Sequence, residues 1–123
     1  SGDCEDHSIL LASLYKACGL DCSIICIENE NGAHALVEVK NPLHTFENFC
    51  DSLRRFYWKN FDIYPEEIAY EDFKGNEWVV VDTAGDKGSG RSNYVGQLEH
   101  HSYLKYKGEG NWDWKNVAER TRY

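Results

Sequence analysis

Three residues of this sequence carry side chains that together could perform nucleophilic chemistry: Cys4, His34 and Asp82. A cysteine nucleophile needs a thiolate, a base that takes up the thiol proton, and an acceptor that orients the base. A thiol, an imidazole and a carboxylate can fill these three roles. They have chemical meaning as a set only if the fold brings them together, which depends on the elements that carry them.

The thiol of Cys4 lies at the start of a predicted helix that runs from Asp3 to about Cys18. Asp3 is expected to cap the helix, and Asp6 follows as an acidic residue of the first turn. Gly19 suits the left-handed position that commonly follows a helix. Apolar residues recur at helical spacing and only a narrow polar stripe interrupts them, so we expect a mostly buried helix with one apolar face formed by Leu10, Leu11, Leu14 and Cys18.

The surroundings of Cys4 act on its thiol in opposite directions. A helix N-terminus favours the thiolate, which lowers the pKa of a cysteine in the first turn. The neighbouring acids Asp3, Glu5 and Asp6 disfavour the thiolate. A nearby imidazolium would have to outweigh them, and His34 is the best-placed candidate.

His34 and Asp82 are both expected on strands. Residues 21–27 and 33–40 alternate in the manner of a β-hairpin around the polar turn 28–32. Residues 77–82, EWVVVD, form a short and nearly all-apolar run, typical of a strand buried on both faces. Asp82 closes that strand, where a carboxylate can meet an imidazole.

The remaining segments are less regular. Residues 41–76 form a long connection with a possible helix at 47–58, in which Phe49, Leu53 and Phe56 are loosely periodic. The glycine-rich run 85–92 lacks the Gly-Lys-Ser/Thr ending of a phosphate-binding loop and is interpreted as a turn. Strands are expected at 94–98 and 102–107. The aromatic residues Phe56, Tyr57, Trp58, Trp112 and Trp114 are interpreted as core or rim residues, with a peptide-binding groove as the alternative.

Three blocks of the sequence resemble the transglutaminase-like superfamily of cysteine enzymes. GDCEDHSILLASLYKACGLDCSII resembles its nucleophile segment, GAHALVEVK its histidine strand and EWVVVDTAG its aspartate strand, in the family's order. Together they cover about 40 of the 123 residues. The resemblance implies an α+β, papain-like fold in which the nucleophile helix packs on an antiparallel sheet. It also implies a catalytic triad of Cys4, His34 and Asp82.

The activity implied by this resemblance is acyl transfer through a thioester. The expected reaction is hydrolysis of peptide or amide bonds in a peptide or protein substrate, favoured over transglutaminase crosslinking. The alternative is a catalytically inactive domain of the same fold that acts as a binding module. The connection 41–76 separates the histidine and aspartate strands and could serve as a lid or specificity element. The chain opens on Ser-Gly without an initiator methionine, so it is expected to lack native upstream sequence, including any side-chain oxyanion donor found there.

Composition limits the other classes of function. A length of 123 residues predicts a single domain spanning 1–123, and a formal net charge of −8 disfavours nucleic acid as a partner. No apolar run is long enough to cross a membrane. Five cysteines are an odd number for a disulfide framework, which favours a reducing, cytoplasmic location. Cys18, Cys22 and Cys26 do not have the spacing of zinc ligands, and Cys22 and Cys26 are expected on one strand face, so neither a metal nor a cofactor is expected.

Overall fold

Two helices and seven strands occur in the part of the chain that the computed structural model describes, which is residues 2–29, 32–82, 94–97, 104–106, 110–114 and 119–123. The helices are α1 (Gly2–Ala17) and α2 (Phe46–Phe61). The strands are β1 (Cys22–Asn29), β2 (Gly32–Lys40), β3 (Ala69–Phe73), β4 (Asn76–Val81), β5 (Leu104–Tyr106), β6 (Gly110–Trp114) and β7 (Glu119–Arg122).

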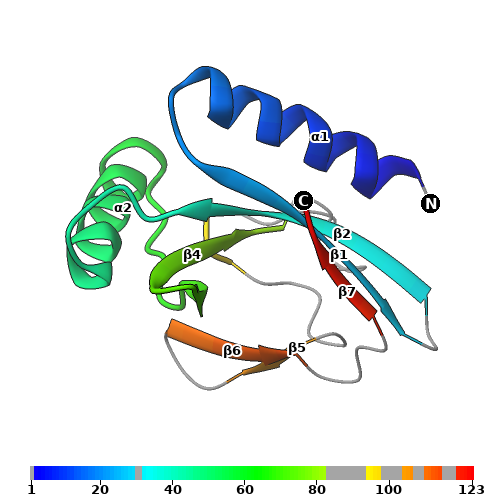
Figure 1. The fold of residues 1–123 in the computed structure, drawn as a ribbon. Helices are drawn as coiled ribbons and strands as arrows, with labels where there is room; N and C mark the ends of the chain where they lie inside the picture. The colour runs from blue at the N-terminus through cyan, green and yellow to red at the C-terminus, as the bar shows by residue number, and fades with distance from the viewer. Residues whose placement is uncertain (1, 30–31, 83–93, 98–103, 107–109, 115–118) are drawn as a thin grey trace.

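The strands form one sheet in the order β5-β6-β3-β4-β2-β1-β7. Neighbouring strands are antiparallel along the run β3-β4-β2-β1-β7, whereas β6 pairs with β3 in parallel. Figure 1 shows that the sheet curls, so that β5 and β6 lie on the opposite side of β1 and β2 from α1. The chain therefore has the α+β class predicted from its sequence.

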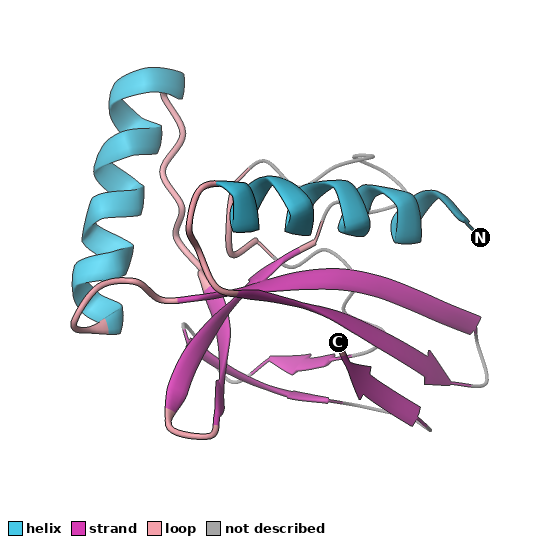
Figure 2. Cartoon of the chain, turned by 45° about the horizontal axis from the view of Figure 1, so that its top comes forward, coloured by secondary structure: helices cyan, strands magenta, loops and turns pink. Residues whose placement is uncertain are grey.

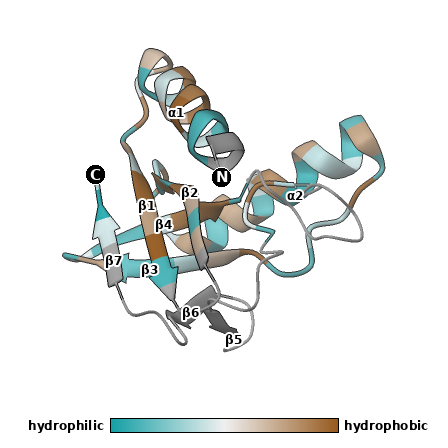
Figure 3. Ribbon diagram, turned by 90° about the vertical axis from the view of Figure 1, so that its right-hand side faces the viewer, coloured by the Kyte–Doolittle hydropathy of each residue, from teal (hydrophilic) through white to brown (hydrophobic). Residues whose placement is uncertain are grey.

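Helix α1 lies along one face of the sheet, whereas α2 stands at one end of it with a steeply inclined axis (Figures 1 and 2). The N-terminus of α1 lies at the end of the sheet opposite to α2 (Figure 1). The apolar core lies between the helices and the sheet, and Figure 3 shows hydrophobic residues gathered along the central strands. Its buried members are Ala12, Cys22, Val37, Val39, Cys50, Ile68, Val79 and Val81.

The prediction of a mostly buried α1 is wrong. Leu10 and Leu14 are 61% and 55% exposed, and Cys18 is exposed, whereas Ser8 and Ala12 are buried. Apolar residues occur on several sides of this helix, so its spacing alone did not identify the inward face. Small residues at positions 8 and 12 allow the helix to lie close to the sheet, with Leu11 and Tyr15 packed beside them.

Of the two ends predicted for α1, the C-terminal end is confirmed and the N-terminal cap is not. The helix begins at Gly2, so Asp3 lies inside its first turn and does not cap it. Gly19 has the expected left-handed backbone, with φ of +82°. The amide of Leu20 donates to the carbonyl of Tyr15 at 3.0 Å, which satisfies a carbonyl of the last turn.

Helix α2 extends the predicted range by a few residues. The Thr45 side chain caps it by accepting from the amide of Asn48 at 3.0 Å, and the helix ends at Asp62 in a left-handed conformation. Of the three periodic residues, Phe49 and Leu53 pack against the core, whereas Phe56 is 53% exposed.

The strand predictions hold for the hairpin and for the aspartate strand, with shifted ends. Strand β3 was missed, although Lys74 and Gly75, both with positive φ, form a two-residue turn that joins it to β4. Residues 94–97 form a turn instead of a strand, and β5 occupies the middle of the range predicted at 102–107. The glycine-rich run 85–92 lies outside the described residues.

Candidate active site

His34 lies near the start of β2, on a strand whose Val and Leu residues favour extended backbone. Antiparallel pairing places it opposite Ile27 of β1. The residue is only 6% exposed. A buried imidazole needs a hydrogen-bonding partner, and the neighbouring strand β4 supplies one.

Asp82 follows β4 directly and is 1% exposed. Strands β2 and β4 are antiparallel neighbours, so the beginning of β2 and the end of β4 meet at the same end of the sheet. There Nε2 of His34 lies 3.1 Å from Oδ1 of Asp82, within hydrogen-bond distance. The structure thus brings together two of the three residues predicted from the sequence.

This geometry defines the chemistry open to the imidazole. If Nε2 carries the proton that is shared with Asp82, the lone pair of the neutral ring lies on Nδ1. The carboxylate fixes the tautomer and the ring orientation, and it stabilises the imidazolium that forms when Nδ1 accepts a proton. The pair can therefore serve as an oriented base.

Cys4 occupies the first turn of α1, but its side chain lies outside the described residues. The position is one helical turn before Ser8, and residues four apart share a helix face. Ser8 is fully buried and packs toward the sheet, and its Oγ has no hydrogen-bond partner.

Strand alternation divides the neighbours of His34 between the two faces of the sheet. Val37 and Val39 belong to the core beneath α1. Because successive side chains alternate, His34 shares the opposite face with Leu36 and Glu38. His34 lies at the hairpin end of β2, and the N-terminus of α1 lies at that same end of the sheet (Figure 1).

A second buried polar cluster occupies the same face as His34. The Nη2 atom of Arg122 lies 2.6 Å from Oε1 of Glu38 and 2.6 Å from Oε1 of Glu71. The guanidinium also lies over the rings of Phe73 and Trp78, 4.1 Å and 4.9 Å from their centroids. Sequence reasoning missed this cluster, and the only local signal was a glutamate between two valines in β2.

Two of the other cysteines, Cys18 and Cys22, are free thiols. Burial is the main cause that raises the pKa of the Cys22 thiol; the charge of Lys16 lowers this pKa and the charge of Asp21 raises it. Cys22 donates to the carbonyl of Ala12 at 3.4 Å and lies in the core. It is therefore a structural residue, as the strand pattern predicted.

Metal and membrane functions find no support in the described part of the chain. No three His, Cys, Asp or Glu residues gather there in a way that could hold a metal ion. No helix among those residues is both long and apolar enough to cross a membrane. His7 is exposed on α1, whereas His100 and His101 lie outside the described residues.

Comparisons with known proteins add no relative. No family model matches the chain, and no match is found among curated proteins or among solved structures.

Proposed function

We propose that this chain is a cysteine-dependent hydrolase or acyltransferase of papain-like architecture, with Cys4 as nucleophile, His34 as base and Asp82 as the orienting acceptor. The 3.1 Å contact between His34 and Asp82 carries the proposal. The sequence resemblance to the transglutaminase-like superfamily supplies the role of Cys4. This role of Cys4 is supported by the arrangement of the elements, because the N-terminus of α1 and the hairpin end of β2, which carries His34, lie at the same end of the sheet.

The reaction follows from the chemistry of the three groups. The Cys4 thiolate attacks the carbonyl carbon of an amide, forming a C–S bond and a tetrahedral oxyanion. The backbone amide of Cys4, at a helix N-terminus, is positioned by its element to stabilise this oxyanion. The imidazolium of His34 gives its Nδ1 proton to the departing amine as the C–N bond breaks. Water then attacks the thioester and gives a proton to His34, and the thiolate leaves.

The proposal requires a particular approach of Cys4 to His34. Strand alternation places the imidazole on the sheet face opposite to the one that α1 covers. The thiol must therefore reach Nδ1 around the hairpin end of the sheet and not through it. The ordinary right-handed twist of β-strands favours this approach, since it rotates side chains at a strand end relative to those in the strand centre.

A binding module without catalysis is the second candidate, and the deep burial of the pair favours it. His34 and Asp82 are 6% and 1% exposed, as expected also for a pair that only stabilises the sheet. In that case Cys4 would behave as an ordinary surface thiol. The two candidates differ in whether Cys4 forms an acyl intermediate.

The experiment is acyl trapping with p-nitrophenyl acetate, followed by peptide mapping in a mass spectrometer. We expect one acetyl adduct on Cys4, lost in Cys4→Ser and retained in Cys18→Ser, which removes an exposed thiol directly after the same helix. Asp82→Asn and His34→Ala should slow acylation, the latter by about 100-fold or more because general-base catalysis is removed. Acetylation that falls equally on Cys18, or a rate unchanged in His34→Ala, would refute the triad and leave the binding module.

A further inference from the structure

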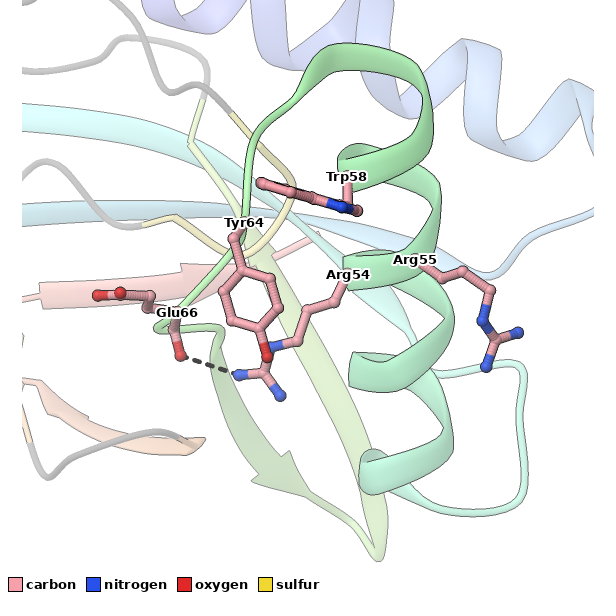
Figure 4. A pocket seen from close by; sticks show the side chains of 5 residues that line it. All are labelled: Arg54, Arg55, Trp58, Tyr64 and Glu66. Carbon is pink, nitrogen blue, oxygen red and sulfur yellow. Dashed lines mark hydrogen bonds between the residues drawn. The ribbon is translucent and has the colours of Figure 1, made fainter.

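A cavity lies beside α2 (Figure 4). Helix α2 stands at the end of the sheet away from the N-terminus of α1 (Figure 1). The volume of the cavity is about 490 Å³, within the range of pockets that hold ligands. Five residues line it: Arg54, Arg55, Trp58, Tyr64 and Glu66. All five come from α2 and the segment that follows it, inside the long connection between the histidine and aspartate strands.

Arg54 holds the wall of this cavity in place. Its Nε donates to the carbonyl of Pro65 at 2.7 Å, and its Nη2 donates to the carbonyl of Glu66 at 2.9 Å. The guanidinium also lies 5.6 Å from the centroid of the Tyr64 ring. Because Pro65 is buried, these contacts tie the helix to a fixed segment. The cavity is therefore pre-formed, which reduces the entropy lost when a ligand binds.

The aromatic surface of the cavity is open to solvent. Trp58 and Tyr64 are 59% and 56% exposed, and Phe61, three residues after Trp58 on the same helix, is 58% exposed. Large aromatic residues that gather at the surface mark binding sites more often than isolated ones do. The exposed aromatic surface continues beyond the cavity to Phe61. Such a surface suits an extended ligand that places one apolar side chain in the cavity.

The charge around the cavity differs from that of the whole chain. The lining holds Arg54 and Arg55 against one acidic residue, and Lys59 lies on the same helix between Asp51 and Asp62, whereas the chain has a net charge of −8. Arg55 is exposed and extends outward from α2 (Figure 4). Glu66 is the acidic residue of the lining, and Figure 4 shows its carboxylate directed away from the Arg54 guanidinium. Carboxylates are the groups that exposed guanidinium donors prefer.

We infer that this cavity binds an acidic peptide segment that places an aromatic or aliphatic side chain between Trp58 and Tyr64, with its carboxylates near Arg55 and Lys59. This inference does not depend on the proposed catalytic function. It assigns the long connection a role in partner recognition at the end of the sheet opposite to His34 and Asp82.

The test uses an acetylated and amidated pentapeptide with phenylalanine at the centre and two acidic residues on each side. Binding is followed by NMR on the ¹⁵N-labelled chain, with the indole signal of Trp58 assigned from Trp58→Phe. A second peptide carries the corresponding amides, and a third has glycine at the centre. We expect the acidic phenylalanine peptide to bind about threefold to tenfold more tightly than either, and to shift the Trp58 signal.

Two variants separate the charge from the aromatic contact. Arg55→Gln should remove most of the preference for the acidic peptide, whereas Lys74→Gln, which removes an exposed charge away from the cavity, should retain it. Trp58→Ala should weaken binding of the acidic and the amide peptide alike. In the unaltered chain, raising the salt concentration should weaken binding of the acidic peptide alone, a readout that requires no variant.

Three outcomes would overturn the inference. The first is equal affinity for the acidic and amide peptides. The second is peptide-induced shifts at the exposed apolar residues of α1, Ile9, Leu10 and Leu14, in place of Trp58. The third is tighter binding of a short oligothymidylate than of the acidic peptide, which would identify the surface as a site for nucleic acid.

Discussion

The two faces of the sheet bury groups of different chemistry. The face beneath α1 is apolar, and the ionisable residues that border it are held neutral: burial raises the pKa of Tyr15 to about 12 and also raises the pKa values of Cys22 and Tyr70. The opposite face buries groups that pair with one another, as in His34 with Asp82. One face therefore stabilises the fold by excluding charge, and the other by compensating it.

The polar face itself contains two different arrangements. Arg122 contacts the carboxylates of Glu38 and Glu71, and a guanidinium offers only hydrogen-bond donors. The imidazole of His34 lies 3.1 Å from the carboxylate of Asp82, and a neutral imidazole has one donor and one acceptor nitrogen. The His34 pair offers a nitrogen that can accept a proton and the guanidinium of Arg122 does not, which is why the pair, and not the larger Arg122 cluster, is the candidate for chemistry.

The largest expected effect concerns the charged cluster. Arg122→Met removes the cation that lies 2.6 Å from the buried carboxylates of Glu38 and Glu71, so we expect a loss of about 3–5 kcal/mol in the free energy of unfolding. The measurement is urea denaturation followed by circular dichroism. Replacing all three residues by apolar ones should restore much of the loss, because no uncompensated charge then remains.

The matched control for this prediction is an exposed ion pair. Lys40 lies 3.9 Å from Asp21, and their side chains are 38% and 76% exposed. Lys40→Met should therefore change the free energy of unfolding by less than about 1 kcal/mol. If Arg122→Met costs no more than Lys40→Met, the cluster does not compensate charge as described.

A smaller effect is expected on the apolar face at alkaline pH. The pKa of Tyr15 is raised from 10.0 to about 12, chiefly by burial, so the folded chain keeps the phenol proton at pH values where the unfolded chain has lost it. This contribution is fully present below pH 10 and is lost as the pH rises toward 12. Because the residue is partly exposed, we expect about 1–2 kcal/mol.

Between about pH 9 and pH 12 the free energy of unfolding should fall in both chains. The fall should be about 1–2 kcal/mol smaller in the Tyr15→Phe variant than in the unaltered chain. Urea denaturation at these two pH values measures the difference. Tyr64→Phe, which removes a 56% exposed phenol, is the matched control for the substitution itself. Parallel losses in Tyr15→Phe and the unaltered chain would show that burial of Tyr15 does not govern alkaline stability.

Secondary structure was predicted most accurately where the residue pattern was compatible with a single type of element. The run EWVVVD admitted only a buried strand, and β4 is such a strand, with Val79, Val80 and Val81 buried. The placement of His34 and Asp82 at adjacent strand ends followed from their elements, although the contact between them required the strand order.

The failures occurred where several patterns competed. Helix α1 has apolar residues on more than one side, so hydrophobic spacing pointed to Leu10 and Leu14, whereas close packing selected the small residues Ser8 and Ala12. The cluster at Arg122 joins β2, β3 and β7, which are far apart in sequence. No local pattern reports such contacts. The cavity at α2 likewise depends on how Arg54 folds the following segment against the helix.

The most direct test of the proposed triad is the pH dependence of Cys4 alkylation by iodoacetamide, resolved from the other cysteines by mass spectrometry. Cys18 is the internal reference because it is an exposed thiol directly after the same helix. The Cys22 thiol is buried and its pKa is raised, so Cys22 should react more slowly than Cys18. We predict that Cys4 reacts fastest near neutral pH and that its reaction persists to lower pH than that of Cys18. His34→Ala should shift the Cys4 profile upward, and Asp82→Asn should shift it less. A Cys4 profile that coincides with that of Cys18, or that is unchanged in His34→Ala, would contradict the triad.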